Sequence, residues 1–442
     1  MRYTRRLGLL PPAIASLAVA PWLSCSPAKA VDGEMDVGGG PGVTDAGDAG
    51  GEAGPCTPRN SFAPGVAPLD MGTTRLPVAK DARTFFAPGY YGDCPRGGVS
   101  FLRLTARSAA LGASAPADSD VAVLCTGPLL TGYPQAVAFS PSQSLVGLAF
   151  RDNVGYLLGT FIAPDDPDWE KPAEPIHHGN VGYYPALEAG TGETLPADAW
   201  GATFDGQDMV VAGGDNDHRG FIARFSRGAL GAVSVVGFQD PRVAGFKAIA
   251  PNKSGGTWVV GRGVGAGALV LAKVTQSNTL DVSWGTGGLV ELGGSDIHQA
   301  SLGVDEAGRI VVGYISGKGG DTQLLRVMPD GNLDVAYGGS GGRVHVPLWN
   351  RNLSGIATST SSFSIAVGGD GTVLVAGGSK GESDPAFIRL DATGRVDAAL
   401  GVVKPPGASE RISESFAVST PPTAGCPGET LIAIGRGGFF FR

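Results

Sequence analysis

The chain has 442 residues, of which 72 are glycine, 42% are hydrophobic and 17% are charged. This composition is too apolar for a wholly disordered chain, and it lacks the glycine period of collagen. The net charge of −8 at pH 7 disfavours a nucleic-acid-binding protein, because phosphate backbones attract basic surfaces. The length fits two or three average domains or one repeat fold.

Residues 1–30 have the pattern of an export signal. Arginines near the start precede an apolar stretch at 7–23, which prolines interrupt and which is too short to span a membrane comfortably. Two processing sites are possible. One is cleavage after Ala30; the other is processing at Cys25, because the sequence LSC that ends there resembles a bacterial lipoprotein box. We expect residues 1–24 to be the signal peptide, with cleavage after residue 30 as the alternative.

A flexible tether is expected after the signal. Residues 31–55 hold nine glycines and six acidic residues but no lysine or arginine, so they cannot bury enough apolar surface to offset the entropy of ordering. We assign 25–55 to a lipid-attachment site and tether. Serine after Cys25, instead of the aspartate typical of inner-membrane retention, favours the outer membrane. The protein is therefore expected to be exported, as an outer-membrane lipoprotein or an extracellular or periplasmic protein.

The remainder, residues 56–442, repeats one unit. Apolar runs that end in a basic residue, with threonine replacing it once, have that residue at 103, 160, 224, 273, 326, 389 and 442. Separations of 49 to 64 residues are typical of a repeat architecture. In six units another apolar run, such as DMVVAGG or RIVVGY, lies before the run that ends in the basic residue. These short, β-branched runs are bounded by glycine, aspartate and asparagine, so they predict strands.

The fold class that follows is all-β. The runs are nearly continuous in hydrophobicity, as in strands that are buried on both faces, and no helical pattern separates them. Each unit holds about four antiparallel strands, which predicts a β-propeller of about seven four-stranded blades, with six as the alternative. The chain stops after the third strand of its last unit. We expect an N-terminal strand from just after the tether to supply the fourth and close the ring.

The glycine-rich stretch RVMPDGNLDVAYGGSGGRV at 326–344 is best explained by turns. Proline presets φ and glycine supplies positive φ in its PDG turn, whereas a phosphate-binding loop would lead into a helix. The stretch resembles the delta-sixty repeat, known mainly from deltaproteobacterial envelope and secreted proteins. The match is good at 273–290 from Leu280 onward and partial at 389–401. The resemblance implies a propeller-like fold and no defined activity.

Three base–acid pairs lie eight residues apart in the repeated units. Their spacing predicts that they face one another across the third and fourth strands as structural ion pairs, not as catalytic groups. Exposed pairs of this kind contribute only about 0–1 kcal/mol each. The pairs are Lys273 with Asp281, Arg326 with Asp334, and Arg389 with Asp397.

Five cysteines are present, and lipidation of Cys25 would leave four for disulfides in an exported protein. The hairpin topology of the first unit favours a bond between Cys94 and Cys125. Closure of the ring by an N-terminal strand favours Cys56 with Cys426. No CxxC motif or Cys/His cluster is present, so we expect neither a metal nor a cofactor.

Residues 163–200 form the longest irregular connection. Long loops on rigid scaffolds often carry binding, and the alternative is an elaborated outer strand without a ligand. If a ligand surface exists, its candidate residues are Trp169, His177, His178, Tyr183 and Tyr184.

No GxSxG, HExxH or Walker motif occurs, so the sequence favours a protein without catalytic activity. We expect a monomeric binding or scaffold propeller, secreted or anchored at the cell envelope, whose partner is an envelope protein or a glycan. Contact with the membrane is expected only through the lipid anchor. The alternative is a secreted propeller hydrolase or lyase acting on glycan or peptide, which requires carboxylates or histidines converging at one face of the ring.

Overall fold

The chain divides into two units, Met1–Glu52 and Ala53–Arg442. The computed structural model describes parts of the second unit only, so the predicted signal peptide, Cys25 and the whole tether lie outside the described residues. The described residues are 62–64, 78–79, 84–88, 100–105, 121–125, 132–152, 155–162, 184–185, 197–215, 220–226, 233–237, 242–264, 267–295, 297–316, 322–339, 341–346, 363–378, 385–398, 402–403, 415–419, 430–434 and 437–441.

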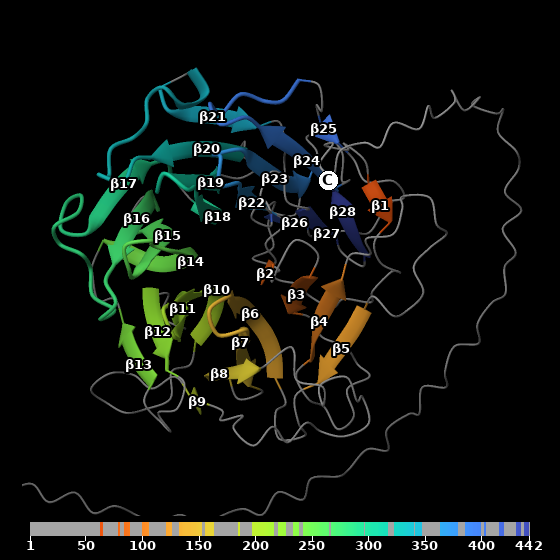
Figure 1. Ribbon diagram of the computed structural model, residues 1–442. Helices are drawn as coiled ribbons and strands as arrows, with labels where there is room; N and C mark the ends of the chain where they lie inside the picture. Colours follow the sequence, from red (N-terminus) through yellow and green to blue (C-terminus); the bar gives the residue numbers. More distant parts are fainter. Residues whose placement is uncertain are drawn as a thin grey trace, which may run out of the picture. The chain divides into compact units, whose positions relative to one another are not determined.

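The described residues form seven four-stranded antiparallel sheets (Figure 1). In the first three, consecutive strands are neighbours. They are β2 (Val78–Ala79), β3 (Thr84–Pro88), β4 (Ser100–Thr105) and β5 (Val121–Cys125); β6 (Gly132–Ser140), β7 (Leu145–Asp152), β8 (Leu157–Ile162) and β9 (Tyr184–Pro185); and β10 (Ala197–Asp205), β11 (Asp208–Asp215), β12 (Gly220–Phe225) and β13 (Val233–Gly237).

The next three sheets have the same order. They are β14 (Val243–Pro251), β15 (Thr257–Gly263), β16 (Leu269–Val274) and β17 (Leu289–Gly293); β18 (Ile297–Val304), β19 (Ile310–Ser316), β20 (Thr322–Val327) and β21 (Arg343–Val346); and β22 (Ser364–Val367), β23 (Val373–Gly378), β24 (Pro385–Leu390) and β25 (Val402–Val403). One short 3₁₀ turn, η4 (Tyr337–Gly339), precedes β21.

The seventh sheet joins two distant parts of the chain. Its strands β26 (Ser415–Ser419), β27 (Thr430–Ile434) and β28 (Gly437–Phe441) come from the C-terminal end, and β1 (Phe62–Pro64) pairs with β28. The register places Phe62 opposite Phe441 and Pro64 opposite Phe439. An N-terminal strand thus occupies the fourth position of the last sheet.

The apolar runs form strands because both of their faces are covered. All six residues of β12 are buried, as are the first six residues of β19. Tight turns connect the first and second strands, and Gly206 adopts a φ of 63° in the turn between β10 and β11, where a larger residue would be strained. The prediction of an all-β fold built from repeated four-stranded sheets is confirmed.

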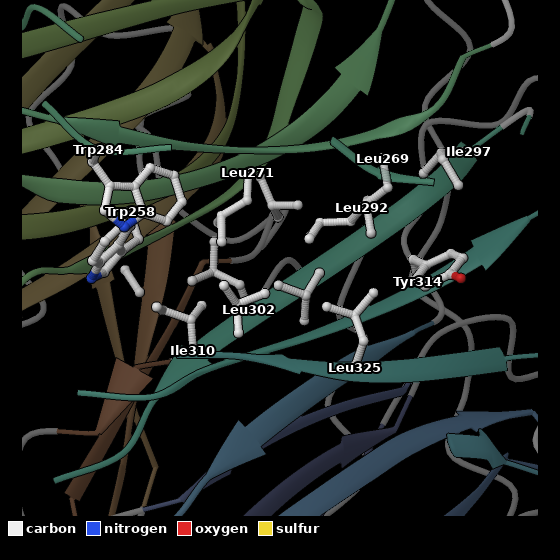
Figure 2. Packing of buried hydrophobic residues seen from close by; sticks show 14 residues of the cluster. Trp258, Leu269, Leu271, Trp284, Leu292, Ile297, Leu302, Ile310, Tyr314 and Leu325 are labelled. Atoms are coloured by element: carbon white, nitrogen blue, oxygen red, sulfur yellow. The ribbon is translucent and has the colours of Figure 1, made fainter. Parts of the chain in front are cut away.

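Successive sheets pack through their apolar faces, and the first strand of each sheet contacts the first strand of the next. Figure 2 shows the cluster between the sheet that starts with β14 and the sheet that starts with β18. There Leu271 from β16 lies above Leu302 and Ile310, and the rings of Trp258 and Trp284 meet edge to face at a centroid distance of 4.9 Å. In the described part of the chain, no helix has the length and hydropathy needed to cross a membrane.

Candidate functional site

The predicted ligand surface falls almost entirely outside the described residues. Trp169, His177, His178 and Tyr183 are among the residues that the structure does not describe, and only the backbone of Tyr184, the first residue of β9, is placed. This surface stays a prediction.

The residues of the predicted disulfides also fall largely outside the described part of the chain. Cys56, Cys94 and Cys426 lie outside the described residues. The backbone of Cys125 ends β5 and pairs with Ser100, the first residue of β4. Both disulfide bonds therefore remain predictions.

The three base–acid pairs are in contact. The nitrogen-to-oxygen distances are 2.8 Å for Lys273–Asp281, 2.6 Å for Arg326–Asp334 and 2.6 Å for Arg389–Asp397. Their placement differs in one respect from the expectation that they face one another across the third and fourth strands.

Each aspartate lies in the return segment that precedes the fourth strand. Its amide donates to the backbone oxygen of its basic partner, as from Asp334 to Arg326 at 2.8 Å, just beyond an isolated bridge such as Val327 with Leu333. The bridge extends the third strand's hairpin, so the acid meets the base before the fourth strand begins. An eight-residue spacing fits this tight return equally well.

The ion pair of Arg326 and Asp334 also contacts the next sheet. Arg326 Nη1 donates to the backbone oxygen of Ala392, 2.5 Å away, and its guanidinium lies 4.4 Å from the centroid of the Tyr337 ring. The amide of Gly338 donates to the Thr393 oxygen at 2.7 Å. These contacts join the turn after β20 to the turn after β24, which gives the pair a structural role.

A second ion pair, between Arg224 and Asp205, was not predicted from the sequence. Arg224 in β12 donates from Nη2 to Asp205 Oδ2 at 2.8 Å, and both side chains are at least nine-tenths buried. Arg224 Nε reaches Asn278 in the following sheet at 3.0 Å, while Asp205 Oδ1 accepts from the Gly256 amide at 3.1 Å. The sequence marked Arg224 as a repeated base, but its acid lies 19 residues earlier.

The titration behaviour of these groups follows from their partners. Hydrogen bonds from Lys273 and Ser283 hold the pKa of Asp281 below its usual value. Burial raises the pKa of Asp334, but the hydrogen bond and charge of Arg326 outweigh it, so the net shift is downward. Burial raises the pKa of Tyr337 to about 12. All three shifts are accounted for by structural contacts.

The first strands of four consecutive sheets share a feature that the other strands largely lack. The pairing of each first strand with its second strand is interrupted by β-bulges, whereas the pairing of second with third strands shows no shift in register. A bulge inserts one residue, re-aims its side chain and is over-represented next to binding sites. The inserted residues are Gln135, Trp200, Ala244, Lys247 and His298.

Two of these inserted residues meet between neighbouring sheets. Lys247 from β14 places its Nζ 4.2 Å from the centroid of the Trp200 ring of β10. Both side chains are only partly buried. A lysine over an indole face is attracted by the ring quadrupole, so each side chain restricts the position of the other.

A polar cluster continues from Trp200 towards the preceding sheet. Two residues before it, Asp198 Oδ1 accepts from Gln135 Nε2 at 2.5 Å and from Arg151 Nη1 at 2.9 Å. Gln135 Oε1 in turn accepts from the Ala199 amide at 2.7 Å. The buried amide thereby fixes a carboxylate whose side chain is 35% exposed.

We call Gln135, Arg151, Asp198, Trp200 and Lys247 the bulge cluster. It joins an aromatic face, an ammonium group and an oriented carboxylate across three consecutive sheets. Such a set can hold a ligand that has both polar and apolar surface. Among the described residues, no group of three or more His, Cys, Asp or Glu side chains is placed to hold a metal ion.

Sequence reasoning missed the bulge cluster. The strands are recognisable by apolar residues at repeated positions, whereas Trp200 and Lys247 interrupt the repeat. The one available signal was the placement of a large aromatic and a lysine inside first strands that are otherwise rich in small and apolar residues.

No family model matches the chain, and no curated protein matches its sequence. Solved β-propellers resemble it in structure. The β-propeller domain of Cps50 (Swd1) from Myceliophteria thermophila has 10% identity and a TM-score of 0.49, and covers 86% of this chain and 99% of its own. The WD40 propeller domain of Doa1 has 11% identity and a TM-score of 0.45, with coverages of 87% and 96%.

A putative 6-phosphogluconolactonase from Bacteroides fragilis is also similar. Its identity is 14% and its TM-score 0.47, with coverages of 81% of this chain and 89% of its own. At these identities and TM-scores the likenesses carry no argument about activity.

Proposed function

We propose that the seven sheets are the blades of one closed β-propeller. The pairing of β1 with β28 supports this, as do the contacts of β2 with both β6 and β26, because they connect the first sheet to the second and to the last. Closure by an N-terminal strand protects the sheet edges that an open stack would expose.

The propeller serves as a binding or scaffold module of the cell envelope. The observation that carries this proposal is the bulge cluster, in which partly exposed Trp200 and Lys247 are in contact and Asp198, two residues before Trp200 in β10, is held by Gln135. By contrast, the repeated base–acid pairs hold the turns after the third strands, and the Arg326 pair also joins two sheets. The export pattern and the delta-sixty resemblance support an exported protein, anchored through Cys25 or released after Ala30.

Co-sedimentation tests this function. The full chain is expressed in a Gram-negative host, and its partition between envelope and soluble fractions is compared with that of Cys25→Ala. The purified protein is then mixed with isolated envelope fragments and centrifuged. We expect wild-type protein to sediment with the fragments, and Trp200→Ala to reduce the sedimented fraction.

The control variant is Val335→Ala, which truncates a side chain whose residue is 68% exposed in the turn after β20. Equal sedimentation of wild type, Trp200→Ala and Val335→Ala would reject the bulge cluster as the binding surface. Absence of sedimentation for all three proteins would reject the envelope-binding function.

A hydrolase or lyase that acts on glycan or peptide stays the second candidate. The feature that favours it is the Asp198 carboxylate beside Arg151, because oriented carboxylates serve as acids and bases in glycoside chemistry. Incubation of the full chain with polysaccharide, followed by an assay for new reducing ends, separates catalysis from binding.

A further inference from the structure

The fourth position of the last sheet is filled from the opposite end of the chain. In the other six sheets the fourth strand is the next strand after the third, whereas the chain connects β1 to β28 only through those six sheets. Figure 1 shows β1 beside β28. No short turn enforces this pairing, so the edge of β28 recognises β1 through the backbone hydrogen bonds of the pairing itself.

The pairing of β1 is short compared with the pairing on the other side of β28. There, β27 pairs with every residue of β28. β1 covers only residues 439–441, and Pro64, which lies opposite Phe439, has no N–H group to donate. We therefore expect β1 to detach from this sheet at a lower free energy than β27.

A second copy of the chain carries the same strand. When β1 of one copy pairs with β28 of another, it makes the backbone contacts that it makes within its own chain, so the exchange loses no strand pairing. The balance between the two arrangements depends on the connection from β1 to β2, which contacts β26 of the same last sheet. This connection, residues 65–77, has 13 residues and spans at most about 45 Å. A link of this length gives a tethered strand an effective concentration on the order of 1 mM.

We propose that the outer edge of β28 is a strand-binding site that takes β1 of a second copy when copies are concentrated. At micromolar concentration in solution, the chain's own β1 occupies the edge. Anchoring through Cys25 confines copies to one membrane plane and raises their local concentration, so strand exchange joins anchored copies. The exchange rests on the closure of the last sheet by β1, and its place at the membrane rests on the proposed lipid anchor.

Two single-cysteine variants detect the exchange. Phe62 lies opposite Phe441, and directly opposed positions of antiparallel strands are close enough for a disulfide bond. The full chain is produced as Phe62→Cys and, separately, as Phe441→Cys. Neither protein can form a 62–441 disulfide within one molecule. That bond in a mixture therefore requires β1 of one copy on β28 of another.

The mixture is equilibrated at about 10 μM and at about 1 mM, which lie below and near the effective concentration of the tethered strand. It is then oxidised briefly and mapped by peptide mass spectrometry without reduction, which separates the 62–441 bond from bonds of the native cysteines. We expect the fraction of exchanged molecules to be at least about tenfold larger at the higher concentration.

Two controls accompany the mixture. The double variant Phe62→Cys/Phe441→Cys reports pairing within one molecule. A mixture of Phe62→Cys with Phe440→Cys reports random oxidation, because residue 440 lies opposite Ala63 and successive residues of a strand point to opposite faces. We expect an intramolecular bond in the double variant and no 62–440 bond in the second mixture. Thermal unfolding of each variant confirms that it is folded.

An intramolecular bond in the double variant, without a 62–441 bond in the mixture at the higher concentration, would reject the exchange and leave the closure in place. Absence of the bond from both would reject the closure as well. Equal yields of the 62–441 and 62–440 bonds would show that random oxidation joins the copies.

Cells that produce both single-cysteine variants test the place of the exchange. The 62–441 bond is expected in the envelope fraction, and Cys25→Ala in both variants is expected to lower its yield. If the exchange occurs in solution but Cys25→Ala leaves the cellular yield unchanged, the strand-binding site stands and concentration by the lipid anchor is rejected.

Discussion

Arg224 in β12 donates from its Nε to Asn278 Oδ1 in the turn after β16, across a distance of 3.0 Å and between two different sheets. The same guanidinium holds Asp205, whose side chain is 5% exposed. Neighbouring sheets are thus joined by a buried charge network as well as by apolar packing. Each partner depends on the other, because an unpaired charge in this environment is costly.

Arg224→Met is therefore expected to lower the free energy of unfolding by about 3–5 kcal/mol, because it leaves Asp205 buried without its cation. The control is Arg389→Met, since the side chains of Arg389 and Asp397 are 32% and 24% exposed. That loss is expected to be only about 0–1 kcal/mol. Urea unfolding followed by tryptophan fluorescence measures both. Equal losses for the two variants would show that burial of the Arg224 network is not the decisive factor.

A turn glycine that lies close to a neighbouring sheet is expected to be more sensitive to substitution by alanine than one that does not. Gly331 has a φ of 94°, and a Cβ there would lie 3.2 Å from Trp284, whereas Gly206 has a φ of 63° and nothing within 4 Å of its Cβ position. Alanine at either position costs about 1–2 kcal/mol in backbone strain. At Gly331, overpacking against the indole adds about 1–3 kcal/mol.

Thermal melts of Gly331→Ala and Gly206→Ala test this difference. Trp284 also donates from its Nε1 to the Pro329 backbone oxygen at 3.0 Å, so displacement of the ring breaks a hydrogen bond between the sheets. Gly331→Ala should have the lower melting temperature. The opposite order would mean that the ring moves aside at no cost.

Local features of this fold were predictable from the sequence. The pairing of Arg326 with Asp334 depends on a hairpin of eight residues, so its geometry is set by neighbours in the chain. The strands were recognisable because runs buried on both faces are continuously apolar, as in β12. The pairing of β1 with β28 followed from counting the strands in the last unit.

The candidate site was not predictable in the same way. A β-bulge adds one residue to a strand without a characteristic residue type, so nothing in the sequence marked Trp200 and Lys247 as inserted residues. The partners of Arg224 are equally hidden, since Asn278 lies 54 residues further along the chain. Contacts between sheets depend on how far each sheet is rotated against the next, which local patterns do not encode.

Stability is expected to fall in acid through the repeated turns. The pKa of Asp281 is lowered by hydrogen bonds from Lys273 and Ser283, and that of Asp391 by a hydrogen bond from the Thr393 hydroxyl. A carboxylate with a lowered pKa binds protons more weakly in the folded state. Its contribution is therefore present above the unfolded pKa of about 3.9 and is lost as the pH falls through the folded pKa.

Urea unfolding at pH values from about 5 to 2 tests this dependence around the aspartate pKa. The double variant Asp281→Asn/Asp334→Asn should be less stable than wild type at pH 5 and should lose less stability as the pH falls. The Asp334 pKa is also lowered on balance, because the bond to Arg326 outweighs burial. Parallel curves for the two proteins would show that these aspartates do not carry the acid sensitivity.

Tyr337 gives the last prediction, because its hydroxyl is buried and has no hydrogen-bond partner among the described residues. An unsatisfied buried polar group costs about 1–3 kcal/mol, so Tyr337→Phe is expected to raise the free energy of unfolding at neutral pH. The ring packs against the turn of the next sheet, where a Cβ at Gly394 would lie 2.8 Å from it.

The alkaline limb provides an independent readout of the same group. Burial raises the Tyr337 pKa to about 12, so ionisation of this tyrosine favours the unfolded state. The free energy of unfolding is therefore unaffected by this ionisation below the unfolded pKa of about 10, and it falls as the pH rises towards the folded pKa. Tyr337→Phe should remove that loss. The control is Tyr314→Phe, because the Tyr314 hydroxyl donates to Gln323 at 2.6 Å and accepts from Arg343 at 2.7 Å. That variant should be destabilised at neutral pH by about 1 kcal/mol, and a Tyr337→Phe protein that is equally destabilised would show that the Tyr337 hydroxyl is hydrogen-bonded after all.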